Sequence, residues 1–169
     1  MTAPRSRPAR RGSATNIPWF AFVAVYAFGV VGAALVSQHL FSMQPCPWCV
    51  LQRLIFLAIG IFAVLGLVWR GPAGGRVAGT FGLLLAVAGL AAALWHYFVA
   101  SNSASCKLTL ADRIMTTSQL DRLLPDVFEA RASCADAAVT VLGVPYPIWS
   151  ALAFVICAVM LVRILRRSA

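Results

Sequence analysis

Four apolar runs, each long enough to cross a lipid bilayer, constrain the fold of this chain more than any other feature. They cover residues 17–41, 47–69, 77–100 and 147–165 of a 169-residue sequence that is 61% hydrophobic. A helix of ~20 apolar residues spans a hydrocarbon core of ~30 Å, and its backbone hydrogen bonds are all made within the segment. The sequence therefore predicts an all-α membrane protein, a four-transmembrane-helix bundle without a separate soluble domain.

The distribution of arginine predicts how the bundle is oriented. The net charge of +9 is concentrated in the two tails and in the short connection at 70–76. Because cytoplasmic segments carry the excess of Lys and Arg, we expect basic cytoplasmic tails at 1–16 and 166–169. A single membrane domain at 17–165 would then place its outer loops, 42–46 and 101–146, on the opposite side. No continuous basic face with interleaved aromatic residues occurs, so we expect no nucleic-acid partner.

The N-terminal run raises the question of a cleaved signal peptide. It is too long for the apolar core of a signal peptide, and no clear small-x-small cleavage site follows it. We therefore expect the first helix to be retained.

Residues 46–49 read Cys-Pro-Trp-Cys and stand where the second apolar run begins. The N-terminus of a helix starting there would favour thiolate over thiol, and Arg53 would share a helix face with Cys49. A disulfide across so short a loop stabilises little. A structural metal site normally takes four N or S ligands, and no second CxxC is present. We interpret Cys46 and Cys49 as a redox pair, with no metal.

Cys106 and Cys134 bracket the second outer loop. A disulfide between them could fasten the loop, contributing about 3 kcal/mol, or it could relay electrons, and spacing alone does not separate the two roles. Apolar residues at helical spacing within 118–131 predict a short amphipathic interfacial helix, bent or restarted at Pro125. Cys157, in the middle of the fourth run, is interpreted as a small buried apolar residue.

Three polar residues lie near the outer ends of the predicted helices. Arg53 can be a snorkelling anchor, or it can stabilise the Cys49 thiolate and an anionic acceptor beside it. His39 and His96 are typical of interfacial hydrogen-bonding residues, and His96 could also donate to a bound carbonyl.

In the order of these elements, the chain resembles the disulfide bond formation protein B (DsbB) family, quinone-linked thiol oxidases of the bacterial cell envelope. The resemblance covers nearly the whole chain and is clearest between Gln38 and Trp149. The matching residues are Gln38-His39, Pro45-Cys46-Pro47-Trp48-Cys49, Gln52-Arg53, Cys106, Leu124-Pro125-Asp126-Val127-Phe128, Cys134-Ala135 and Leu142-Gly143-Val144-Pro145.

The resemblance implies a reaction and roles for these residues. A reduced, periplasmic DsbA-like partner of thioredoxin fold would attack a Cys106–Cys134 disulfide and form a mixed disulfide with Cys106. Cys134 would then exchange with Cys46, leaving Cys49 as a thiolate beside ubiquinone or menaquinone.

The resemblance also implies supporting residues and a location. Arg53 matches the arginine that supports the quinone and the thiolate. His96 lies near the quinone-side loop, but no compact motif fixes its correspondence. The location would be the bacterial inner membrane. The pair Pro47-Trp48 varies in the family and could alter the redox poise.

Two alternatives remain open at this point. A vitamin K epoxide reductase-like bundle also couples cysteines to a quinone, although its CxxC resembles a late-helix feature. A thiol-based electron conduit or membrane scaffold would use no quinone.

Overall fold

Four long helices dominate the structure, a computed structural model that describes residues 16–69, 71–102, 110–136 and 139–168. They are α1 (Ile17–Leu40), α2 (Pro47–Val68), α3 (Pro72–Phe98) and α7 (Tyr146–Ser168). Each is long and apolar enough to cross a membrane. The predicted four-helix membrane bundle is confirmed. Two bounds differ from the prediction, because α3 begins before residue 77 and α7 continues beyond residue 165.

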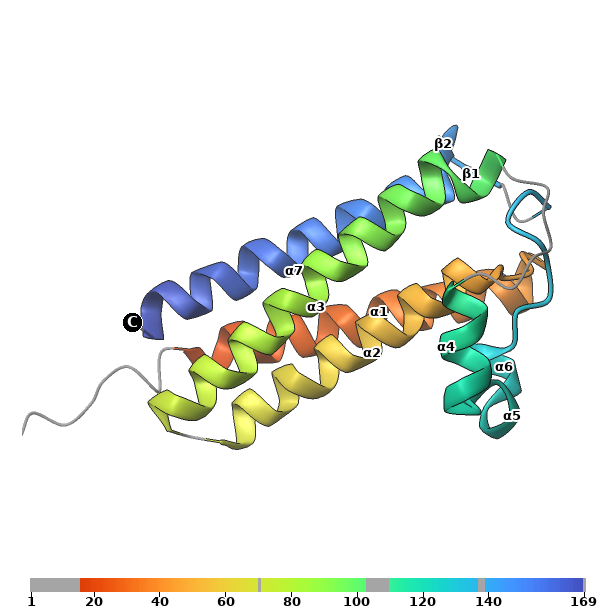
Figure 1. Ribbon diagram of the computed structural model, residues 1–169. Coiled ribbons are helices and arrows are strands. Elements are labelled where there is room, and N and C mark those ends of the chain that lie inside the picture. Colours follow the sequence, from red (N-terminus) through yellow and green to blue (C-terminus); the bar gives the residue numbers. More distant parts are fainter. Residues whose placement is uncertain (1–15, 70, 103–109, 137–138, 169) are drawn as a thin grey trace, which may run out of the picture.

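The helices follow one another around the bundle (Figure 1). α2 packs along both α1 and α3, and α3 packs along α7, whereas α1 and α7 contact each other much less extensively. The start of α1, the connection from α2 to α3, and the C-terminus lie at one end of the bundle. The segments between α3 and α7 lie at the other end, as four crossings require.

Local sequence explains why α2 begins where the two cysteines stand. Pro47 occupies the first turn, where its missing N–H and fixed φ are compatible with a helix. Cys46 is the N-cap, and its Sγ accepts a hydrogen bond from the Cys49 backbone N–H at 3.4 Å. The start of the helix thus brings the two sulfurs to the same side of the first turn.

Close packing in the core depends on small residues that let the helices approach each other. The rings of Phe56 and Phe154 stack with their centroids 3.9 Å apart. Phe154 lies directly over Gly89, where a Cβ would be 2.2 Å from its Cε1 atom. Without water to drive association, such close contacts are what hold membrane helices together. Cys157 is 1% exposed in this same core, in agreement with its predicted packing role.

The second outer loop contains three short helices at one end of the bundle: α4 (Leu110–Ser118), α5 (Leu120–Leu123) and α6 (Pro125–Phe128). The predicted helix within 118–131, restarted at Pro125, is present as α5 and α6, whereas α4 lies before the predicted range. A left-handed residue, Gln119 (φ 54°), separates α4 from α5, and Glu129, which follows α6, is extended.

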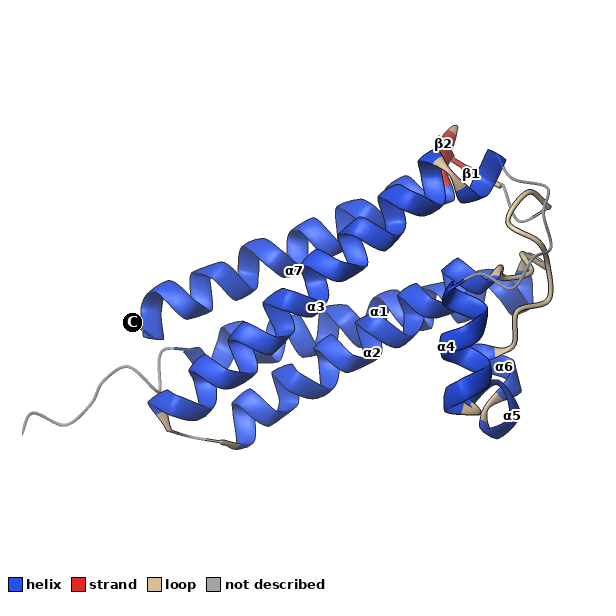
Figure 2. Cartoon of the chain, viewed as in Figure 1, coloured by secondary structure: helices blue, strands red, loops and turns tan. Residues whose placement is uncertain are grey.

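A small hairpin that the sequence did not predict precedes α7 (Figure 2). Its strands are β1 (Thr140–Val141) and β2 (Val144–Pro145), paired antiparallel. The two turn residues, Leu142 and Gly143, both have positive φ (54° and 78°), as a type I′ hairpin turn requires. The indole Nε1 of Trp149 donates to the Val141 carbonyl at 3.2 Å and fastens the hairpin to α7.

Candidate redox site

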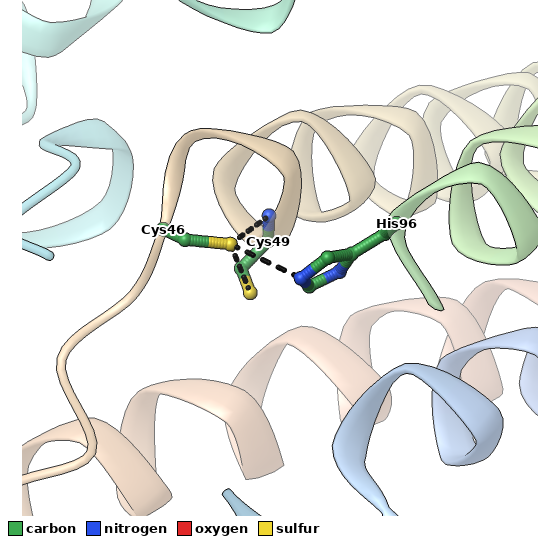
Figure 3. A group of neighbouring side chains, drawn as sticks. All are labelled: Cys46, Cys49 and His96. Atoms are coloured by element: carbon green, nitrogen blue, oxygen red, sulfur yellow. Dashed lines mark hydrogen bonds between the residues drawn. The ribbon is translucent and has the colours of Figure 1, made fainter. Parts of the chain in front are cut away.

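The cysteine pair at the start of α2 lies beside His96, from the last turn of α3 (Figure 3). Cys46, Cys49 and Cys134 are free thiols. The Sγ atoms of Cys46 and Cys49 are 3.0 Å apart, and the Nε2 of His96 lies 3.5 Å from the Cys46 Sγ. The donor atoms of the three residues all lie within 4.8 Å of one another. They form one buried thiol–imidazole cluster.

Cys134 reaches this cluster from the outer loop. Its segment is fastened by the backbone N–H groups of Arg131 and Ala132, which donate to the Pro45 carbonyl at 3.0 and 3.3 Å. Cys134 is buried and packs in the same apolar cluster as Cys46. The structure therefore brings together three of the four cysteines that were predicted to be catalytic. The fourth, Cys106, lies outside the described residues, so its pairing with Cys134 remains a prediction.

The environment gives the two neighbouring thiols different protonation states. A hydrogen bond from Cys46 is the main cause that lowers the pKa of Cys134 to about 5, against the opposing effect of burial. Hydrogen bonds from His96 and from the Trp48 backbone N–H act in the same direction as the one from Cys46. The hydrogen bonds to Cys134 and Cys49, together with burial, raise the pKa of Cys46. Near neutral pH, Cys134 is a thiolate that faces a protonated Cys46 in this reduced state.

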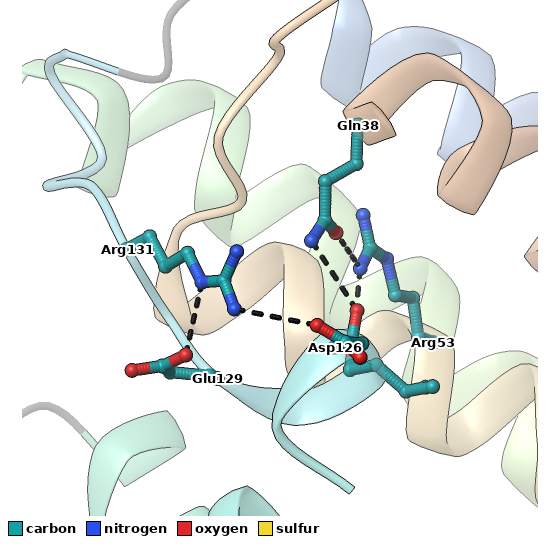
Figure 4. A network of polar contacts seen from close by, with 6 residues as sticks. Gln38, Arg53, Asp126, Glu129 and Arg131 are labelled. Atoms are coloured by element: carbon teal, nitrogen blue, oxygen red, sulfur yellow. Dashed lines mark hydrogen bonds and ion pairs between the residues drawn. The ribbon is translucent and has the colours of Figure 1, made fainter. Parts of the chain in front are cut away.

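Arg53 is buried, 6% exposed, and its guanidinium is hydrogen-bonded to α1 and to the outer loop (Figure 4). Nη1 donates to the Gln38 side-chain oxygen at 2.6 Å and to the Val127 carbonyl at 3.2 Å. Nη2 donates to the Ala34 carbonyl at 3.3 Å. The snorkelling interpretation does not fit these contacts. Sequence reasoning gave Gln38 no role, although a glutamine inside an apolar run indicates a buried polar partner.

A cavity of about 440 Å³ lies between α1 and α7, which contact each other less than the other neighbouring long helices do. Its lining is mostly apolar and includes Tyr26, Val30, Phe41, Met43, Trp149 and Ala153. Two smaller cavities, both lined by Cys49 and Arg53, share lining residues with the large one. Tyr146 lines all three, a position that sequence reasoning missed because the residue reads as the end of a loop.

His96 lies in the last turn of α3, near the outer end of the helix, as the sequence suggested. Its Nε2 is 3.5 Å from the Cys46 Sγ, and its Nδ1 is 3.4 Å from the side-chain nitrogen of Gln52. Arg53 lines the two smaller cavities. The binding of a cofactor by Arg53 and His96 remains a prediction.

The chain is similar over most of its length to proteins of one family. The family described as "Disulfide bond formation protein DsbB" matches residues 16–164. A "Disulfide bond formation protein B" from Ralstonia nicotianae is 36% identical over 157 residues, 88% of this chain and 93% of the relative. The protein of that name from Cupriavidus necator is 33% identical over 164 residues, 92% of this chain and 96% of the relative.

These matches agree with the four spanning helices and with the clustered thiols. They cover both the bundle and the outer loop, so the similarity is not confined to the CxxC motif. The chain belongs to the DsbB family: it is a multi-pass bacterial inner-membrane protein with an oxidoreductase role in disulfide bond formation.

Proposed function

We propose that this protein reoxidises a periplasmic DsbA-like partner of thioredoxin fold and passes the electrons to a membrane quinone, ubiquinone or menaquinone. The observation that carries the proposal is the placement of the Cys134 thiolate next to Cys46, with Cys49 lining a cavity on the other side. Electrons can enter at the loop and leave at the cavity. The protein is then a protein-dithiol:quinone oxidoreductase.

Thiol–disulfide exchange in four steps would bring electrons to the CxxC pair. A partner thiolate forms a bond to Cys106 and releases Cys134 as a thiolate. Cys134 attacks Cys46 of a Cys46–Cys49 disulfide, so that one sulfur–sulfur bond forms and Cys49 leaves as a thiolate. The partner's second thiolate displaces Cys106, and Cys106 then displaces Cys46 from Cys134. The partner is now oxidised, and the Cys46–Cys49 pair holds its two electrons.

Restoring the Cys46–Cys49 disulfide requires a two-electron acceptor, and a quinone held beside Cys49 would supply that capacity. The large cavity has the size and mostly apolar lining usual for small-molecule sites. Tyr146 lines it, and Tyr146, Arg53 and Cys49 together line the two smaller cavities. We assign Arg53 to the support of the quinone and of the Cys49 thiolate.

The arginine distribution supports an orientation with both termini in the cytoplasm. The start of α2, which carries Cys46 and Cys49, lies at the end of the bundle opposite to the C-terminus (Figure 1), so with cytoplasmic termini the redox loops would face the periplasm. Disulfides persist in that compartment. We retain the assignment of residues 17–165 as one membrane domain with short basic tails.

The test uses the full chain in lipid nanodiscs that contain ubiquinone or menaquinone, with a reduced DsbA-like protein as electron donor. Loss of the quinone absorbance is expected for the wild type. Cys49→Ser should abolish turnover. Cys157→Ser, which changes a thiol in the core, should leave turnover unchanged. Undiminished quinone reduction in Cys49→Ser would contradict the proposal, and the quinone that supports the faster rate identifies the acceptor.

A further inference from the structure

We propose that His96, held in one tautomer by Gln52, is a catalytic hydrogen-bond donor to the sulfur atoms during exchange between Cys134 and Cys46. This inference rests on the proposed function and assigns its exchange step to particular side chains. Gln52 is then a positioning residue, because it acts on the sulfurs only through His96.

The contacts of the His96 ring determine which nitrogen carries the proton. Its Nδ1 is 3.4 Å from the side-chain nitrogen of Gln52, and both residues are buried, with exposures of 2% and 4%. An amide nitrogen has only protons to offer, so Nδ1 must accept. The ring proton therefore resides on Nε2, which faces the Cys46 Sγ at 3.5 Å.

A donor at this place stabilises negative charge on the sulfurs throughout the exchange. Before the step the charge is on Cys134, and the hydrogen bond from His96 is one of the causes that hold its pKa low. As the bond between Cys134 and Cys46 forms, the bond between Cys46 and Cys49 breaks and the charge moves to Cys49. The donor atoms of Cys46, Cys49 and His96 lie within 4.8 Å of one another, so one N–H serves both ends of the step. No proton needs to move.

A fixed hydrogen-bond donor in a site that excludes water stabilises a developing charge more than the same donor does in solvent, because no surrounding dipoles have to reorganise when the charge develops. The apolar cluster around Cys46, which includes Trp48, Met115 and Phe128, provides that exclusion.

Few titratable groups face His96, which makes its effect measurable. Among the described residues they are Cys46 and Cys49 from the start of α2, and Cys134 from the outer loop. An assay that follows the thiols therefore reports on the imidazole with little interference from other charges.

The first experiment needs neither quinone nor partner. Reduced protein in nanodiscs, in a Cys106→Ser background, is alkylated at pH 4–9, and labelling of Cys134 is followed by mass spectrometry. His96→Leu should raise the midpoint pH of labelling by about one unit, which is about tenfold less thiolate below the midpoint. His96→Gln, whose amide can still donate, should restore most of this shift, and Gln52→Leu should give part of it. His39→Leu, a change at an exposed histidine, is the matched control.

The second experiment measures the rate of exchange in the unsubstituted background. His96→Leu should slow formation of the Cys46–Cys134 disulfide about tenfold. An unaltered alkylation midpoint, or exchange at the normal rate, overturns the role of His96 but leaves the proposed function intact. Absence of quinone reduction in the wild type defeats the proposed function, whereas the alkylation result still decides what His96 does to the thiols.

Discussion

The side-chain oxygen of Gln38 accepts a hydrogen bond of 2.6 Å from the Nη1 of Arg53, and this pair joins α1 to α2 beneath the redox loop. The Gln38 amide donates in turn to the Asp126 carbonyl at 3.2 Å, and Arg53 donates to the Val127 carbonyl. Figure 4 shows both side chains directed at the same turn of the loop. The pair therefore connects the helices beside the cavity to the segment that leads to Cys134.

We predict that Gln38→Leu loosens the outer loop. The substitution removes the link from α1 to the exposed Asp126 and one of the two acceptors of the buried Arg53 Nη1, and leaving a buried donor unsatisfied costs about 1–3 kcal/mol. Trypsin should cleave after Arg122 and Arg131 several times faster in nanodiscs, and turnover should fall with it. His39→Leu, at the neighbouring exposed position, serves as the control. Equal cleavage rates in the two variants would mean that these hydrogen bonds do not hold the loop.

A second prediction concerns the pH dependence of Cys134. Its pKa of about 5 depends mainly on the hydrogen bond from Cys46. Cys46→Ala should therefore raise the midpoint pH of Cys134 alkylation toward the ordinary value for a thiol, about 8.5, in reduced protein. Cys157→Ala is the control, because Cys157 lies in the helix core away from this cluster.

The same shift has a consequence for stability, and its sign follows from linkage. The folded state lowers the pKa of Cys134, so the thiolate contributes stability above the ordinary pKa of a thiol, and this contribution is lost as the pH falls toward about 5. The midpoint temperature of thermal unfolding of the reduced protein should therefore decrease as the pH falls through this range. The decrease should be smaller in Cys134→Ala. An identical pH profile in that variant would contradict the lowered pKa of Cys134.

The features that could be predicted from sequence are those encoded in short stretches of chain. The apolar runs predict the four spans, Pro47 and the cysteines mark the start of α2, and Pro125 marks a helix restart. The break between α4 and α5 was not predicted, because Gln119 adopts a left-handed conformation that is uncommon for its residue type. The hairpin was missed for the same reason at Leu142.

The candidate site depends on contacts between segments that are distant in sequence. The proximity of Cys134 to Cys46 was expected only from the family resemblance, and it depends on how the loop docks on Pro45. The contacts of Gln38 with Arg53 and of Gln52 with His96 follow from the rotation of each helix in the bundle. The spacing of apolar residues does not determine that rotation, because in a membrane helix the side that faces lipid and the side that faces protein are both apolar.

A third prediction tests the packing of α3 on α7. Gly89→Ala should lower the thermal midpoint in nanodiscs by several degrees, because the new Cβ would lie 2.2 Å from the ring of Phe154. Gly32→Ala, a position with nothing within 4 Å of the added atom, should be neutral or slightly stabilising. Adding Phe154→Leu should recover part of the loss caused by Gly89→Ala. Additive effects of the two substitutions would show that they do not share a contact.

The last prediction asks whether the cavity between α1 and α7 admits the quinone. Ala33 lines this cavity and is exposed, so Ala33→Trp can fill space there without overpacking the core. We expect the KM for quinone to rise at least about tenfold, a loss of about 1.4 kcal/mol of binding free energy. The partner-driven formation of the Cys46–Cys134 disulfide should proceed at its normal rate, because the thiol cluster lies outside the large cavity.

Val87→Trp, on the exposed face of α3, adds the same side chain away from the cavity and should leave the KM unchanged. Equal KM values in the two variants would place the quinone elsewhere on the bundle.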